Sequence, residues 1–139
     1  MAKEMRLLGF NFTKMSVEKN PEFQGKIEIN SKMDVADIEK HKPTILKQDT
    51  AKIKFSFTID YKELGKIELE GFMIWLFDKK TLKEVLENWN KKDLEQEIRT
   101  QVLNAVLQKC SLQALKLEEQ FNLPLHMQMP SVKVDPPSE

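Results

Sequence analysis

Residues 51–61, AKIKFSFTIDY, alternate strictly between apolar and polar side chains. A β-strand directs successive side chains to opposite faces of its sheet, so this two-residue period predicts a strand with one buried and one hydrated face. The isoleucines and aromatic residues on the apolar face also favour strands. We therefore expect a sheet that buries one face, with further strands in the segments on either side.

Two segments before this strand have the same character. Residues 26–35 repeat the alternation, and only Ser31 interrupts their apolar face. Within residues 7–18, Phe10 and Phe12 lie at even positions, whereas Met15 and Val17 lie at odd positions. The inward face must therefore switch near Thr13 or Lys14, and a β-bulge would produce that switch.

A fourth strand is predicted at residues 66–77, where the sequence alternates at first and becomes continuously apolar after Gly71. Both faces of that end should be covered, by helices or by another subunit. The short connections at 62–65 and 20–24 favour antiparallel pairing of sequential strands. The connection at 38–50 is longer, and we expect it to cross over the sheet.

The chain after residue 78 is predicted to be helical. Apolar residues at i, i+3, i+4 and i+7 indicate a short helix over 82–89. The 29 residues at 93–121 contain no proline or glycine and predict a helix about 43 Å long. The expected fold class is α+β: a four-stranded antiparallel sheet with a long crossover loop, then a short and a long C-terminal helix. One domain would occupy residues 1–134, followed by a disordered tail at 135–139.

The predicted long helix carries more apolar residues than one sheet can cover. A single stripe is enough to pack on a sheet, and additional leucines widen this one. Burial against a second copy of the chain would explain the surplus, although a helix wrapped by its own tail would show the same pattern. We assign the interface of a homodimer or homotetramer to four of these residues: Leu103, Leu107, Leu112 and Leu115.

Residues 123–134 should be extended, since Pro124 and Pro130 end helices and restrict the residues before them. Apolar side chains alternate within this segment and include methionines, whose flexible thioethers adapt to many shapes. With the apolar end of the fourth strand and two residues of the crossover loop, they form the predicted polypeptide-binding surface. Its members are Ile45, Leu46, Trp75, Phe77, Leu125, Met127 and Met129.

The charge balance excludes several classes of protein. The 22 basic and 22 acidic residues give a formal net charge of +0, so the chain lacks the field of a dedicated nucleic-acid binder. Four glycines without a glycine-rich loop provide no phosphate-binding site. One cysteine, no apolar run of about 20 residues and no signal-peptide pattern at the start indicate a cytoplasmic protein without membrane insertion.

The titratable residues argue against an enzyme, a metal site or a bound cofactor. His41 and His126 have no partner at motif spacing, and we interpret both as solvated surface residues. Cys110 lies on the apolar stripe of the long helix, where cysteine acts as a small buried hydrophobe. Glutamate pairs such as Glu118 and Glu119 are expected on hydrated faces rather than as catalytic dyads.

The order of these elements resembles that of the SecB export chaperone and its SecB-like relatives. The sequence SVE at 16–18, followed by Pro21, is similar to the family's Ser-Phe-Glu and following proline, with valine in place of the aromatic residue. Pro124 and Pro130 are similar to the two prolines of the family's closing segment. The resemblance covers residues 7–132.

This resemblance implies subunits that pair through sheets and long helices into dimers or dimers of dimers. It also implies a hydrophobic groove that holds unfolded polypeptide without ATP. The family's export chaperone meets its translocation motor through an acidic sheet surface, whereas this chain is neutral and mixes lysine with glutamate on its strands. Docking of such a motor is therefore not expected.

Two functions follow from the apolar surplus. The leading one is an ATP-independent holdase for unfolded or non-native polypeptides, in protein export or in another pathway. The alternative is a dedicated assembly or regulatory subunit that binds one specific protein through the same surface. The range of clients separates them, because a holdase should protect several unrelated unfolded proteins.

Overall fold

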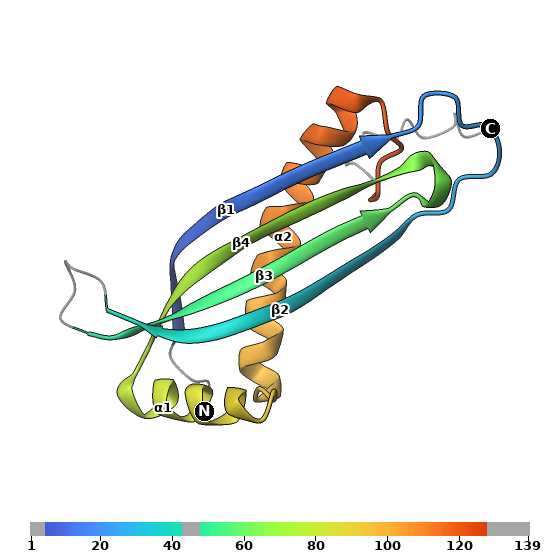
Figure 1. Cartoon of the computed structure of the whole chain (residues 1–139). Helices are drawn as coiled ribbons and strands as arrows, with labels where there is room; N and C mark the ends of the chain where they lie inside the picture. Colours follow the sequence, from blue (N-terminus) through green and yellow to red (C-terminus); the bar gives the residue numbers. More distant parts are fainter. Residues whose placement is uncertain (1–4, 43–47, 128–139) are drawn as a thin grey trace, which may run out of the picture.

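Four antiparallel strands form one sheet in the order β1-β4-β3-β2, and two helices follow it in the chain (Figure 1). A computed structural model describes residues 5–42 and 48–127. The predicted α+β class is confirmed. The elements are β1 (Met5–Lys19), β2 (Asn30–His41), β3 (Thr50–Asp60), the short 3-10 helix η1 (Lys62–Leu64), β4 (Gly65–Phe77), α1 (Lys79–Asn90) and α2 (Gln96–Phe121).

The strand order corrects two predicted connections. β1 and β2 lie at opposite edges, so residues 20–29 carry the chain around the end of the sheet (Figure 1). The predicted crossover at 38–50 is wrong, because β2 and β3 pair directly and His41 lies opposite Thr50. The reason is a bulge after Val35, which lets β2 continue with its apolar side inward at Ile38.

β1 has the irregularity that its sequence predicts. The pairing of β1 with β4 shifts between Phe12 and Lys14, where the parity of the apolar residues changes. On β4, Gly71 lies directly opposite Phe12, and a Cβ atom there would collide with the backbone oxygen of Asn11. The glycine therefore permits the close approach of the two strands at this point.

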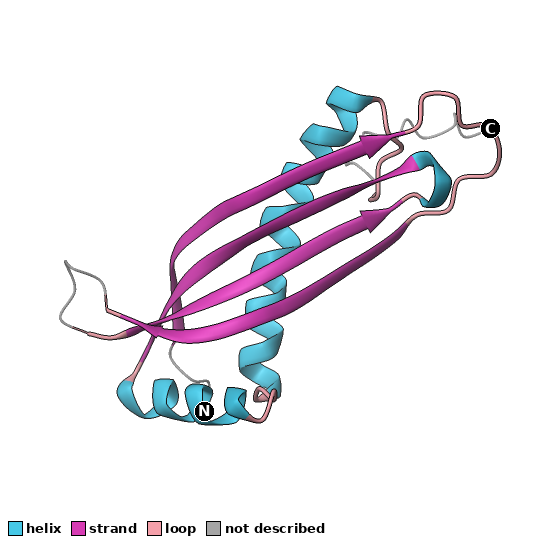
Figure 2. Ribbon diagram, viewed as in Figure 1, coloured by secondary structure: helices cyan, strands magenta, loops and turns pink. Residues whose placement is uncertain are grey.

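α2 crosses one face of the sheet diagonally, and we name this the inner face (Figure 2). The inward residues of the central strands β3 and β4 are all buried, whereas those of the edge strands β1 and β2 are mostly only half-buried. One row of α2, spaced four residues apart, is also buried: Ile98, Val102, Val106, Cys110, Ala114 and Glu118. A helix of 26 residues thus covers the middle of the sheet and leaves its margins partly open.

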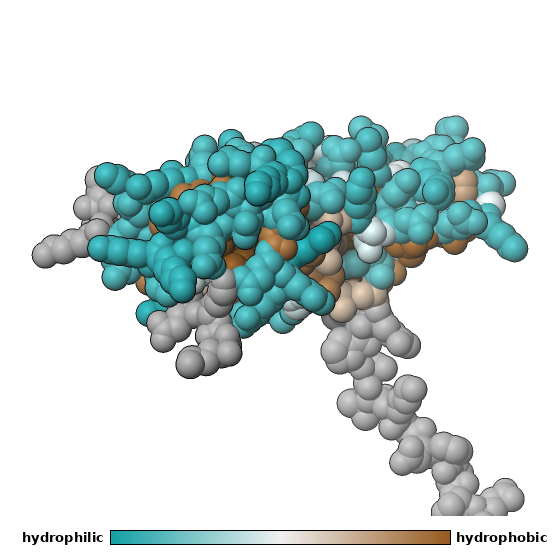
Figure 3. Space-filling view, turned by 90° about the horizontal axis from the view of Figure 1, so that it is seen from below, coloured by the Kyte–Doolittle hydropathy of each residue, from teal (hydrophilic) through white to brown (hydrophobic). Residues whose placement is uncertain are grey.

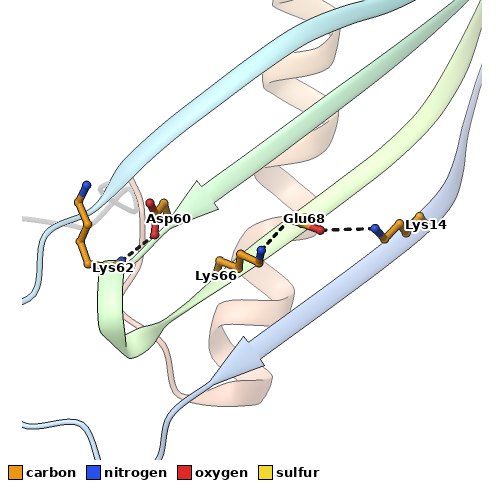
Figure 4. A network of polar contacts seen from close by, with 5 residues as sticks. All are labelled: Lys14, Asp60, Lys62, Lys66 and Glu68. Atoms are coloured by element: carbon orange, nitrogen blue, oxygen red, sulfur yellow. Dashed lines mark hydrogen bonds and ion pairs between the residues drawn. The ribbon is translucent and has the colours of Figure 1, made fainter.

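The outer face is charged at the end near η1. Glu68 lies 3.0 Å from Lys66 and 3.4 Å from Lys14, which joins β4 to β1 (Figure 4). These two lysines, Lys66 first, lower the pKa of Glu68. The polar face predicted for residues 51–61 therefore lies beside charged residues of β4 on the outer face of the sheet.

The other end of the outer face is apolar. Phe72, Ile74 and Leu76 point away from α2 and are half-buried, while Met73 and Trp75 between them are buried on the inner face. The sequence predicts cover on both faces of this end. The described part of the chain covers only the inner face.

Candidate functional site

Apolar side chains remain accessible on both sides of α2. We name the inward residues Phe10, Phe12 and Met15 the β1 ledge, and Met33 and Val35 the β2 ledge. Figure 3 views the molecule from the side on which α1 and β2 lie in Figure 1, and shows apolar atoms beneath a hydrophilic outer layer. The inner face therefore carries accessible apolar side chains at both margins.

The β1 ledge has an aromatic base. The ring of Phe10 stacks on Phe55 with centroids 4.7 Å apart, and Phe12 packs edge-on against Phe10 at 5.2 Å. Met15 lies opposite Leu69 and is exposed. Half-buried rings and an accessible, flexible thioether thus occupy the same margin of the sheet, an arrangement suited to apolar partners of varied shape.

The β2 ledge borders a cleft of about 200 Å³ between the sheet and the start of α2. Met33, Val35 and Leu103 line it, so one residue of the predicted subunit interface faces the sheet margin. Lys92, Arg99, Asp34 and Asp93 also line it. The cleft therefore combines apolar side chains with charges of both signs.

The segment after α2 turns back onto the inner face. Asn122 ends the helix in the left-handed conformation, with φ 56°, and Leu123 is buried. Leu125 and Met127 are 44% and 46% exposed, whereas the side chain of His126 between them points inward. The segment therefore presents two large apolar side chains to solvent.

A buried polar cluster holds this segment in place, and we name Tyr61, Glu118 and His126 the tail anchor. The Tyr61 hydroxyl donates to Oε2 of Glu118, and the backbone N–H of His126 donates to the same oxygen at 2.9 Å. His126 Nδ1 lies 2.8 Å from Glu118 Oε1. Burial, with the neighbouring Glu118 carboxyl group, raises the pKa of Tyr61, so its hydroxyl stays protonated and remains a donor.

The tail anchor corrects two expectations. His126 and Glu118 are predicted to be solvated, but Glu118 is fully buried and the ring of His126 packs edge-on against Phe57 at 6.1 Å. The sequence contains a signal for this, because Glu118 continues the four-residue spacing of the buried row of α2. A carboxylate at such a position needs buried donors, and here Tyr61 and His126 supply them.

The structure separates the predicted polypeptide-binding residues into two groups. Leu125 and Met127 flank His126 in the sequence. The ring of His126 packs against Phe57, and Phe57 lies opposite Leu69 of β4. Trp75 and Phe77 are only 5% and 3% exposed and lie up to eight residues farther along β4, about 26 Å at 3.3 Å per residue. In this conformation Trp75 and Phe77 are core residues. Ile45, Leu46 and Met129 lie outside the described residues.

Phe77 nonetheless lines a wide cleft beside the start of α1. The cleft has a volume of about 810 Å³. Leu82 and Leu86 share its apolar floor, and Lys40 and Lys79 are among the lysines at its rim. This cleft is a second apolar opening, at the far end of the sheet from the tail anchor.

The predicted subunit interface is partly accessible. Leu112 is 61% exposed, the highest value among the exposed large apolar residues of the described chain, and Leu107 is also exposed. Leu103 and Leu115 are half-buried. α2 thus presents leucines that no other described residue covers completely.

The described residues give no support for metal or thiol chemistry. Between 5–42 and 48–127, no three His, Cys, Asp or Glu side chains are placed to hold a metal ion. Burial raises the pKa of Cys110 to about 12, so its thiol is protonated and inert at neutral pH. Its predicted position in the core is confirmed. No helix in the described ranges is long and apolar enough to cross a membrane.

A four-stranded antiparallel sheet followed by a short and a long helix is the α+β arrangement of a SecB-like fold. One solved structure with this fold is a SecB-like chaperone of Mycobacterium tuberculosis in complex with a ChAD peptide from the HigA1 antitoxin. The TM-score is 0.55 and the identity 10%, over 94% of this chain and 93% of that chain. The resemblance seen in the sequence is confirmed at the level of the fold. No family model and no curated protein matches the sequence.

Proposed function

We propose that the protein is an ATP-independent chaperone, a holdase, that binds non-native polypeptides on its inner face. The observation that carries the proposal is the incomplete cover of that face. α2 buries the inward residues of the central strands and leaves the β1 ledge, Leu125 and Met127 accessible. A folded monomer rarely leaves this much apolar side-chain surface accessible unless a partner uses it.

The geometry suits an extended client. On a regular stretch of β1 the inward side chains of Phe10 and Phe12 lie two residues and about 6.6 Å apart, which is also the repeat of side chains on one face of an extended polypeptide. Met15 and Met127 can adjust to different client side chains with little strain. Binding would therefore depend on the distribution of apolar residues in the client and little on its sequence.

The similar chaperone from Mycobacterium tuberculosis was solved with a peptide of another protein, which supports a polypeptide ligand for this fold. We assign client contact to Leu125 and Met127. The roles of Ile45, Leu46 and Met129 stay predictions. Phe77 would reach a client only through the cleft beside α1, and Trp75 is not among the residues that line this cleft.

We also propose that the chain assembles into a homodimer or a homotetramer through α2. Leu107 and Leu112 are the accessible centre of this surface. Pairing of these helices would bury them and leave the tail and the β1 ledge available for clients. A cytoplasmic location, inferred from the single cysteine, belongs to the same proposal.

Light scattering tests the holdase function. The full chain should suppress aggregation of two unrelated proteins, reduced α-lactalbumin and chemically unfolded rhodanese, without added ATP. Replacing Leu125 and Met127 with serine should weaken the protection several-fold, while Lys116→Ser, an exposed change on α2, should not. Failure to protect either protein contradicts the proposal, and tight binding to a single cellular protein would instead identify a dedicated assembly subunit.

A further inference from the structure

The outer face of the sheet carries a second apolar surface, on the side opposite the proposed client site. It consists of Phe72, Ile74 and Leu76 on β4 with Leu8 on β1, and we name it the outer strip. Leu8 is the additional residue of a bulge and is 39% exposed. None of the four belongs to the core, which is filled from the inner face. The outer strip is therefore apolar for a reason other than packing within the described subunit.

A glycine leaves the centre of the outer strip open. Gly9 lies directly opposite Ile74, and a Cβ atom at Gly9 would lie 3.9 Å from Cγ1 of Ile74 in ordinary contact. Gly9 does not have a positive φ, so the backbone does not require glycine here. Glycine inside a strand often marks a place where a ligand or another chain approaches closely. The absence of a side chain at Gly9 therefore exposes one side of Ile74.

Three cations border the outer strip. Arg6 lies opposite Leu76 on β1, and on β3 Lys52 and Lys54 lie opposite Ile74 and Phe72. Lys52 Nζ lies 4.5 Å above the ring of Phe72. Arg6 and Lys54 form no ion pair with any described residue.

The acidic groups near this surface lie one strand beyond the lysines. On β2, Glu39 lies opposite Lys52 and 3.9 Å from it, and Asp37, which accepts from Trp89 Nε1, lies opposite Lys54. Glu70 ends the strip on β4, with Lys14 opposite it. The charged residues directly opposite the strip on β1 and β3 are therefore positive, in a chain whose net charge is +0.

We propose that the outer strip docks an acidic amphipathic helix of a partner protein. From Phe72 to Leu76 the strip is about 13 Å long, which matches two helical turns of about 10.8 Å. Apolar residues at i, i+3, i+4 and i+7 of the helix contact the strip, and its carboxylates meet Arg6, Lys52 and Lys54. Because the clients occupy the inner face, the protein can hold a client and this partner together.

A second copy of the chain fits this surface poorly. A standard interface buries about 800 Å² on each partner, far more than four partly exposed side chains provide. A two-fold contact would also bring the two cationic borders together, and like charges disfavour such pairing. A single acidic helix needs a smaller contact area, and its charge is opposite to that of the border.

The test uses a fluorescein-labelled peptide with leucine at i, i+3, i+4 and i+7 and glutamate elsewhere. Fluorescence anisotropy with the full chain should show saturable binding. Ile74→Glu, and Arg6→Glu combined with Lys54→Glu, should each weaken binding at least tenfold. Thr58→Glu, a change on the outer face of β3 at the other end, should have little effect. Gly9→Leu fills the open flank without adding charge and should also weaken binding, which covers the case in which Ile74→Glu fails to fold.

Four results would overturn the proposal. The first is that the wild-type chain shows no saturable binding, or that a peptide with lysine in place of glutamate binds equally well. The second is that folded Gly9→Leu and Ile74→Glu chains bind the acidic peptide as the wild type does. The third is that Ile74→Glu lowers the solution mass of the protein, which would assign the strip to a second copy. The fourth is that client protection falls together with peptide binding, which would assign the strip to the client site.

Discussion

The carboxyl group of Glu118 joins three parts of the chain. It accepts from the hydroxyl at the end of β3 and from the backbone of the segment after α2, and it pairs with the His126 ring. Each buried donor that loses its acceptor costs about 1–3 kcal/mol. The backbone between Leu125 and Met127 is therefore held by one side chain of α2.

Glu118→Ala should lower the free energy of unfolding by about 3–5 kcal/mol, because it leaves at least two buried donors without an acceptor. Urea denaturation measures this loss, and hydrogen exchange should show faster opening of residues 123–127. The matched control is Glu119→Ala, an exposed neighbour, which should change stability by less than about 0.5 kcal/mol. Equal effects of the two changes would show that the tail anchor is not a stabilising element.

Tyr61 is the only tyrosine of the chain, so its ionisation can be followed directly by ultraviolet absorbance. Its pKa is raised in the folded state, first by burial and then by Glu118. The folded chain therefore binds this proton more tightly than the unfolded chain, and the stability contribution is present below about pH 10 and is lost as pH rises. We expect tyrosinate to appear only when the protein unfolds, and near pH 10 in urea. Titration of the folded chain near pH 10 would contradict the buried hydrogen bond.

At the scale of the elements, the sequence predicts each strand and helix but not how the strands connect. Alternation reports which side chains face inward; here those of β3 and β4 are buried, and those of β1 and β2 are mostly half-buried. Connection length does not report pairing partners: residues 20–29 include Ile27 and Ile29, which alternate like a strand although β2 begins only at Asn30. The side chain of His126 points inward between the exposed Leu125 and Met127. No periodicity reveals that orientation, although the spacing of Glu118 indicates its partner.

Buried and exposed residues of the segment after α2 should respond differently to substitution by serine: Leu123 should affect stability, and Leu125 with Met127 should affect client capture. Leu123→Ser removes a buried side chain and should cost about 2–4 kcal/mol of stability. The double change of Leu125 and Met127 to serine affects exposed side chains and should leave the melting temperature nearly unchanged while weakening client capture. Melting temperature and client affinity, measured on the same variants, distinguish a core role from a client-binding role. A large stability loss in the double variant would place these residues in the core, and unchanged affinity would remove them from the binding site.

At the scale of the whole molecule, the dimensions of the two layers explain the accessible apolar surface. β1 has 15 residues and spans about 50 Å, while α2 has 26 residues and spans about 39 Å across a sheet four strands wide. One diagonal helix covers the central strands and leaves both ledges, and no other described element lies over its outward leucines. In the proposed assembly a second subunit would cover these leucines and leave the β1 ledge open, so assembly and client binding would use different parts of one apolar face.

Replacing Leu107 and Leu112 together with lysine should therefore reduce the solution mass toward that of one chain, because two buried charges would oppose each pair of helices. Sedimentation equilibrium at micromolar concentration measures the mass. The control adds the same charge away from α2, by replacing exposed Gln24 and Gln48 with lysine, and should keep the wild-type mass. The leucines are accessible in the subunit, so the variant should remain folded and should still protect clients if a single inner face suffices. A wild-type chain that sediments as a monomer would contradict the assembly, and loss of protection by a folded monomeric variant would show that the client site needs two subunits.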